Sequence, residues 1–153
     1  MSLHPFNFSA PLMVLRSAQA HQVEIVDDVG ATLHVEPNDT PKAGEEVLAW
    51  FALTKKGGRT IPLSDCDCEL TVTAQADDSA LLTPSFSAVD AEGYTDIPGA
   101  RFTFPAVGAY TLLLKGSPAG NGDFTPFELD FELTVAAGVR SPTPSNAPTP
   151  EAV

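Results

Sequence analysis

Apolar and polar residues alternate one by one along several stretches of this chain. In the longest stretch, residues 127–135, every second residue is apolar and the residues between them are acidic or threonine. Shorter stretches with the same period lie at 66–72, 102–104 and 110–114. A period of two gives a β-strand one apolar face for a core and one polar face for solvent. These stretches therefore predict half-buried antiparallel strands.

Three more strands are predicted in the first third of the chain, at 23–26, 31–35 and 47–53. Turn-forming residues separate the predicted strands, at 38–39, 41, 57–58, 98–99 and 116–122. No long segment has helical spacing between good capping residues. The pattern predicts an all-β fold, an antiparallel two-sheet immunoglobulin-like sandwich of about seven strands that occupies residues 21–138.

One segment carries a more specific resemblance. The residues from Phe104 to Tyr110 read Phe-Pro-Ala-Val-Gly-Ala-Tyr, and leucines follow at alternate positions. This order resembles the approach to strand F of immunoglobulin-like domains, where a tyrosine hydroxyl folds back onto the loop before it, the tyrosine corner. The resemblance implies that Tyr110 is buried beside Phe102 or Phe104. Trp50 lies in an early strand, but the Cys…Trp…Cys set of antibody domains is missing.

The first 20 residues differ from the predicted domain. They hold a short apolar patch at 11–15 and end on Ala18-Gln19-Ala20, the small-x-small pattern that signal peptidase prefers. They have no Lys or Arg near Met1 and no clean apolar stretch of signal-peptide length. We interpret residues 1–20 either as the remnant of an export leader or as a disordered arm.

The other end of the chain is rich in proline. Most of residues 141–150 are Pro, Ser or Thr. Proline fixes its own backbone and offers no amide donor, so such a tract stays extended and packs no core. We expect residues 139–153 to form a stalk that associates the domain with a membrane or an anchor. The domain itself is expected to be extracytoplasmic, in a periplasm, in a lumen or at the cell surface.

The charge of the chain excludes one class of partner. The 153 residues have a formal net charge of −12, and the eight basic residues are scattered. Such a surface repels phosphate backbones, so we expect no nucleic acid as a ligand. No apolar run reaches the roughly 18 residues that a membrane helix needs.

The sequence is poor in catalytic motifs. It has no Gly-x-Ser-x-Gly elbow, no His-Glu-x-x-His and no phosphate-binding glycine loop. Its three histidines, His4, His21 and His34, all lie in the first quarter of the chain. We therefore predict that the protein is not an enzyme and has no resident cofactor.

Cys66 and Cys68 are the only cysteines and are two positions apart. On a strand both side chains point to the same face, which continues into Leu70 and Val72. Three interpretations follow. The favoured one makes both sulfurs small core groups. The others are a disulfide, which an exported protein favours but close spacing opposes, and a pair of thiolate ligands for Cu(I) or Zn(II).

A second resemblance concerns copper. The order His34-Val35-Glu36-Pro37, followed by an Ala-Gly pair and a strand, is similar to the opening of small exported sandwiches such as the CopC and YtkA-like groups. The stretch His-Val-Glu-Pro-Asn-Asp-Thr-Pro also resembles one in an uncharacterised group of exported cyanobacterial proteins. The resemblance implies a copper site. Because the chain has only two methionines, a Met-rich Cu(I) site is not carried over.

The histidines are the candidate ligands for that copper. If cleavage follows Ala20, His21 becomes the mature N-terminus and offers an amine and an imidazole, a pair that chelates Cu(II). His34 is a candidate third nitrogen. It falls on the strand face opposite Leu33 and Val35, so we expect it to be accessible to solvent.

Two hypotheses of function follow. The favoured one is a non-enzymatic extracytoplasmic interaction module that docks a protein partner through a sheet face or a loop end. The alternative is a copper-handling protein of the CopC and YtkA kind, which uses His21 and His34 or the cysteine pair.

Overall fold

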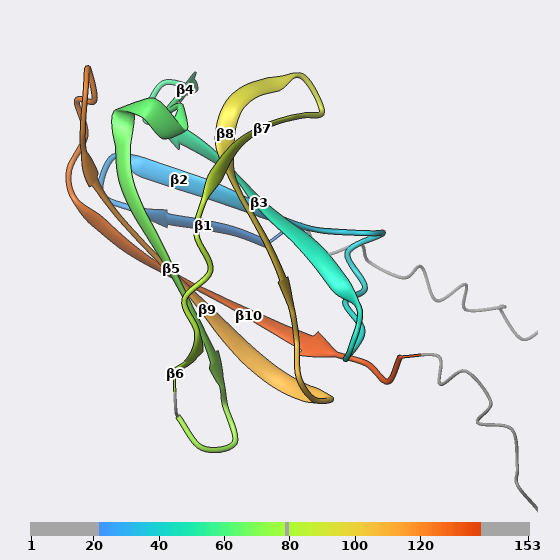
Figure 1. Cartoon of the computed structure of the whole chain (residues 1–153). Coiled ribbons are helices and arrows are strands. Elements are labelled where there is room, and N and C mark those ends of the chain that lie inside the picture. Colours follow the sequence, from blue (N-terminus) through green and yellow to red (C-terminus); the bar gives the residue numbers. More distant parts are fainter. Residues whose placement is uncertain (1–21, 79, 139–153) are drawn as a thin grey trace, which may run out of the picture.

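The computed structural model describes residues 22–78 and 80–138, which form two packed sheets (Figure 1). The predicted leader or arm, residues 1–20, and the predicted stalk, residues 139–153, lie outside this part of the chain. The strands are β1 (Gln22–Val26), β2 (Val29–Glu36), β3 (Glu46–Lys55), β4 (Arg59–Thr60), β5 (Cys66–Ala74), β6 (Ala80–Leu82), β7 (Ser87–Ala91), β8 (Tyr94–Thr103), β9 (Gly108–Pro118) and β10 (Phe127–Val135), and a 3-10 turn, η1 (Leu63–Asp65), precedes β5.

All strand pairs of the two sheets are antiparallel. The first sheet has the order β1-β2-β3-β8-β7, with β4 paired to β3, and the second has the order β10-β9-β5-β6. The predicted all-β, two-sheet antiparallel sandwich is therefore confirmed. The described chain has ten strands instead of about seven, because β4, β6 and β7 are short and carry no apolar alternation that a sequence pattern would reveal.

Two predicted turns are wrong: residues 116–118 of the predicted turn at 116–122 belong to β9, and the predicted turn at 98–99 belongs to β8. Pro98 and Gly99 lie inside β8, where Pro98 pairs with Ala88 and Gly99 with Ser87 and Trp50. A Cβ on Gly99 would lie 2.8 Å from a methyl carbon of Val89. The glycine is needed because a neighbouring side chain crosses its backbone at this point, and not because the chain turns.

The main core lies between the two sheets. Phe51, Phe104, Tyr110 and Phe131 are among its largest fully buried side chains. Burying a large apolar side chain contributes about 1.5–3 kcal/mol, so these residues dominate the hydrophobic stabilisation. The alternation along β10 is realised as predicted, since four of its five apolar residues are buried and the acidic residues between them are exposed.

The tyrosine corner is present. Tyr110 is 2% exposed and its ring contacts that of Phe104, with centroids 4.8 Å apart. Its hydroxyl donates a hydrogen bond to the carbonyl of Ala106 at 2.8 Å and accepts one from the Ala106 N–H at 3.3 Å. The hydroxyl thus folds back onto the preceding loop, as the resemblance implied.

A second, smaller apolar cluster lies on the opposite face of β3. Phe51 and Leu53 face the main core, so the residues that alternate with them, Trp50 and Ala52, face outward. They are nevertheless buried, together with Ile97 of β8. Their cover comes from half-buried neighbours of the same sheet: Leu48, Val89, Ala91 and Tyr94. The only tryptophan of the chain is therefore buried outside the inter-sheet core.

The edges of the two sheets meet on one side of the sandwich. The Gln22 side chain of β1 donates to the Glu132 carbonyl of β10 and accepts from the Glu132 N–H at 3.1 Å. Val23 and Ile25 of β1 point to the outer face and are 56% and 74% exposed. Over the described residues, no helix is both long and apolar enough to cross a membrane.

Candidate functional site

A hollow of about 650 Å³ lies on the outer face of the first sheet, beside the second apolar cluster. It is bounded by β2, β3, β8 and two turns, and its lining residues are His34, Glu36, Pro37, Asn38, Asp39, Glu46, Leu48, Trp50, Glu92 and Arg101. We call it the His34 hollow.

His34 and Trp50 form the inner wall of the His34 hollow. They are directly opposite each other in the β2–β3 ladder, and their rings stack with centroids 4.0 Å apart and planes 10° apart. His34 does point away from the main core, as predicted, but the expectation that it is accessible is wrong, because only 7% of the residue is exposed. The indole covers one face of the imidazole, and carboxylates flank its edge.

The first flanking carboxylate comes from the β2–β3 turn. Asn38 and Asp39 have φ values of 61° and 54°, left-handed conformations that Asn and Asp tolerate better than most residues. Asp39 is held against the end of β2, since its N–H donates to the Val35 carbonyl and its Oδ1 accepts from the Val35 N–H, each at 2.7 Å. Its other oxygen lies 3.9 Å from Nδ1 of His34.

The second flanking carboxylate comes from a distant part of the chain. Glu92 lies in the turn between β7 and β8, with a φ of 49°. Its Oε2 lies 4.0 Å from Nε2 of His34. Both ring nitrogens of His34 therefore face a carboxylate. A third carboxylate, that of Glu36, accepts a hydrogen bond from the indole N–H of Trp50 at 3.0 Å.

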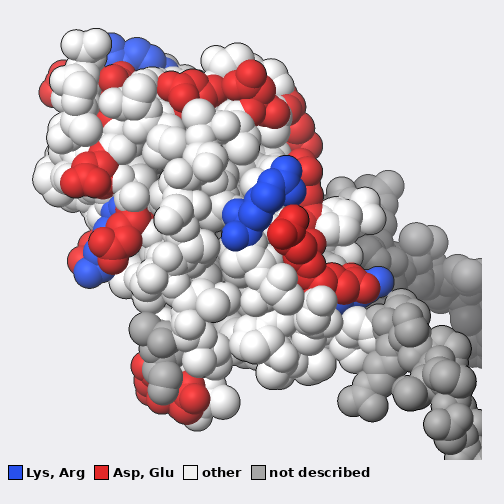
Figure 2. All heavy atoms as spheres, viewed as in Figure 1, with Lys and Arg blue, Asp and Glu red and all other residues white. Residues whose placement is uncertain are grey.

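The His34 hollow is acidic. Glu36, Asp39, Glu46 and Glu92 line it, against one guanidinium, that of Arg101, which lies 3.8 Å from Glu46. Acidic side chains are also widespread on the face of the molecule in Figure 2. A concave surface with an excess of one sign of charge concentrates ions of the opposite sign. The geometry therefore favours a cation, or a cationic group of a partner, over an anion.

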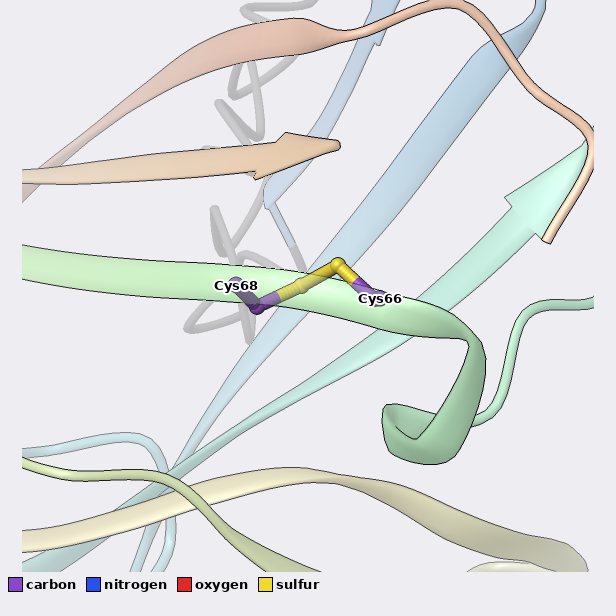
Figure 3. The surroundings of a disulfide bond; sticks show 2 residues. All are labelled: Cys66 and Cys68. Carbon is purple, nitrogen blue, oxygen red and sulfur yellow. A yellow bond between two sulfur atoms is a disulfide. The ribbon is translucent and has the colours of Figure 1, made fainter. Parts of the chain in front are cut away.

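The structure separates the predicted site residues. His34 lies in the His34 hollow, whereas His21 lies outside the described residues. Cys66 and Cys68 lie in β5 of the other sheet and form a disulfide (Figure 3). The favoured interpretation of two unbonded core sulfurs is therefore wrong, although Cys66 is buried. A bridged pair presents no thiolate, so these cysteines are not a ligand pair in this structure.

The sequence did not identify the acidic neighbours of His34. Glu36 could have been identified, because alternation along the strand places it on the same face as His34. Glu92 had no such signal, because its position beside His34 depends on the pairing of β8 with β3 and of β7 with β8.

Comparisons with known proteins show a related fold. No protein-family model matches the sequence, and no curated protein matches it. A DUF4426 family protein from Pseudomonas aeruginosa PAO1 matches in structure with a TM-score of 0.56 and 14% identity, over 79% of this chain and 98% of that one.

FetP of uropathogenic Escherichia coli strain F11, expressed recombinantly in the periplasm, matches with a TM-score of 0.55 and 16% identity, over 76% of this chain and 94% of FetP. A copper-bound variant of FetP matches with a TM-score of 0.56 and 13% identity, over 77% of this chain and 96% of the variant. At these identities the likeness concerns the fold alone, and the chain is a two-sheet antiparallel sandwich similar to those of a DUF4426 protein and FetP.

Proposed function

We propose that this protein is a non-enzymatic, extracytoplasmic binding protein that holds a copper ion in the His34 hollow. The observation that carries the proposal is the 4.0 Å separation between Nε2 of His34 and Oε2 of Glu92. Bonds from a metal to a histidine nitrogen or a carboxylate oxygen are about 2 Å long. An ion between these two atoms therefore spans the gap with little movement of either side chain.

The donor set suits Cu(II). Imidazole nitrogen and carboxylate oxygen are ligands that Cu(II) accepts, and a negatively charged hollow favours a divalent cation. The Oδ2 atom of Asp39 lies 3.9 Å from Nδ1, the other ring nitrogen of His34. Metal-binding histidines commonly have a carboxylate partner beside this second nitrogen. The shared fold with a copper-bound FetP variant is a further, weaker support.

The site needs a further ligand. Among residues 22–78 and 80–138, no three His, Cys, Asp or Glu side chains come together in a ready metal site. We propose His21, the other histidine that the sequence offers as a copper ligand, as the additional ligand; it lies outside the described residues.

The extracytoplasmic part of the proposal is supported by the disulfide. Disulfides persist in oxidising compartments and are rare in the cytosol of most organisms. The periplasmic expression of the FetP neighbour points in the same direction.

A metal titration tests the proposed function. Cu(II) and Cu(I) are titrated into the full chain and into the chain that begins at His21, with Trp50 fluorescence and calorimetry as readouts. We expect stoichiometric Cu(II) binding that quenches Trp50, because this residue stacks on the proposed ligand His34. His34→Gln and Glu92→Gln should each weaken binding at least tenfold, whereas Glu128→Gln, an exposed carboxylate on β10, should not.

Two outcomes would reject the copper site. One is equal Cu(II) affinity in the wild type and in folded His34→Gln. The other is Cu(II) binding no tighter than that of Ca²⁺, which would indicate general attraction to an acidic surface.

A second candidate function is the docking of a protein partner. Val23 and Ile25 expose large apolar side chains on β1, an edge strand, and exposed apolar edges are sites where other chains bind. A photo-crosslinking residue is placed at position 25 of the protein in living cells that naturally produce it, and it should capture one defined partner. The same residue at position 128 should not. Equal labelling from both positions would argue against this surface.

A further inference from the structure

The disulfide joins two residues of one strand. Cys66 and Cys68 are two positions apart in β5, with Cα atoms 5.3 Å apart (Figure 3). The bond therefore connects neither two strands nor the two sheets. A cross-link stabilises a protein mainly by restricting its unfolded chain, and the effect is smallest for the shortest loops. This bridge encloses a single residue, so the fold has little need of it.

The surrounding strand is held in place without the bridge. β5 pairs with β9 along its whole length, including Cys66 with Pro118 and Cys68 with Gly116. These backbone hydrogen bonds do not depend on the oxidation state of the sulfurs. β5 should therefore stay in place whether the cysteines are bridged or reduced.

Cys68 is the more exposed cysteine of the pair, although it packs against the main core. Cys66 is 6% exposed, but Cys68 is only half-buried. On the side of β5 away from β9, the neighbouring strand β6 pairs only with Val72 and Thr73. The described part of β6 thus stops short of the bridge and does not pair with β5 beside Cys68.

We propose that the Cys66–Cys68 pair is a reversible redox group that exchanges with thiols. A thiolate donor attacks Sγ of Cys68, the S–S bond breaks, and Cys66 leaves as a thiolate that takes up a proton. A second donor thiolate attacks the donor sulfur of the mixed disulfide, and Cys68 leaves in the same way. The pair gains two electrons and two protons, and two donor thiols become one donor disulfide.

Charge selects the donor. Asp67 lies between the two cysteines and Glu69 follows them, in a chain with a net charge of −12. Both carboxylates are exposed and point to the face of β5 opposite the sulfurs, where Lys115 pairs with Glu69, so their effect on a donor at the bridge acts at a distance and adds to that of the net charge. An anionic thiol is repelled here and a cationic one attracted, and salt weakens both effects. The substrate class is therefore a neutral or cationic thiol.

The test uses the full oxidised chain in cysteamine/cystamine mixtures of increasing reducing power, with alkylation and mass spectrometry to count free thiols. We expect a reversible change from no alkylated cysteine to two, while circular dichroism and the urea midpoint of the reduced form stay close to those of the oxidised form. Reduction should be faster with cationic cysteamine than with anionic glutathione at low salt, and a combined Asp67→Asn and Glu69→Gln variant should narrow that difference.

Three results would overturn the proposal. The first is that excess dithiothreitol does not reduce the bridge in the folded protein. The second is that the bridge is reduced only when urea unfolds the chain, and the third is that it does not re-form when cystamine is restored. The double variant Cys66→Ser and Cys68→Ser is the control for fold. It should unfold at nearly the same urea concentration as the wild type, and a large loss of stability would show that the bridge is structural.

Discussion

The imidazole of His34 lies flat on the indole of Trp50, with the two ring planes 10° apart. This pair joins β2 to β3 on the outer face of the first sheet and forms the inner wall of the His34 hollow. The indole N–H is directed to Glu36, also on β2, at 3.0 Å. One tryptophan therefore contacts two side chains of the adjacent strand, which orients the polar groups of the hollow.

The Glu36–Trp50 hydrogen bond should contribute to stability. Trp50 is fully buried, so loss of its acceptor leaves a buried donor unsatisfied, at a cost of about 1–3 kcal/mol. We expect Glu36→Leu to lose about this much in urea unfolding and Glu36→Gln, which keeps an acceptor oxygen, to lose clearly less. The indole N–H resonance should shift in the leucine variant. Equal losses in the two variants would show that the hydrogen bond is unimportant.

The tyrosine corner makes a second prediction. Tyr110→Phe removes the hydroxyl that both donates to and accepts from Ala106, and should cost about 1–3 kcal/mol. Tyr110→Ala also leaves a cavity beside Phe104 and should cost about 3–5 kcal/mol.

Tyr94→Phe is the matched control for that series. Tyr94 is half-buried at the start of β8, where its ring lies 6.5 Å from that of Trp50, a contact that phenylalanine keeps. We expect an unfolding midpoint near that of the wild type. Equal midpoints for Tyr110→Phe and Tyr94→Phe would show that the corner contributes nothing.

Gly116 tests how closely β9 packs. A Cβ at this position would lie 2.5 Å from the Phe127 ring and 2.9 Å from Sγ of Cys66, so Gly116→Ala forces the core to move. Overpacking of this kind costs about 1–3 kcal/mol. Gly30→Ala on β2 is the control, because its nearest heavy atom is 3.4 Å away and the added methyl fits. If thermal unfolding finds both variants equally stable, the close packing at Gly116 is refuted.

Asp28 should make stability depend on pH. Its carboxylate accepts a hydrogen bond from the Thr125 N–H at 3.0 Å, and this bond lowers the pKa of Asp28 below the ordinary value of 3.8. A carboxyl with a lowered native pKa stabilises the fold above its unfolded pKa, and the effect is lost as the pH falls through the native pKa.

Asp28→Asn is the variant that tests this dependence. We expect it to be less stable than the wild type near neutral pH, and the gap to close at pH values well below 3.8. Urea midpoints across the acid range measure the gap. A gap that persists unchanged into strong acid would mean that the charge of Asp28 is not the cause.

Much of the fold was predictable because its signals are local. Strands such as β10 can be recognised in the sequence because apolar and polar residues alternate along them. The alternation arises because each residue along a strand points to the face opposite its neighbour. Tyr110 was predictable for a similar reason, as its hydrogen bonds reach only to Ala106, four residues earlier.

The candidate site was predictable only in part, because its contacts cross between distant strands. The sequence by itself determined the sandwich class, the outward direction of His34 and the acidity of the chain. Only the tertiary structure decided that Trp50 covers His34 and that Glu92, far along the chain, faces Nε2 of the same ring. Strand register and order fix such neighbours, and they arise from the packing of the whole core, which no local pattern of residues contains.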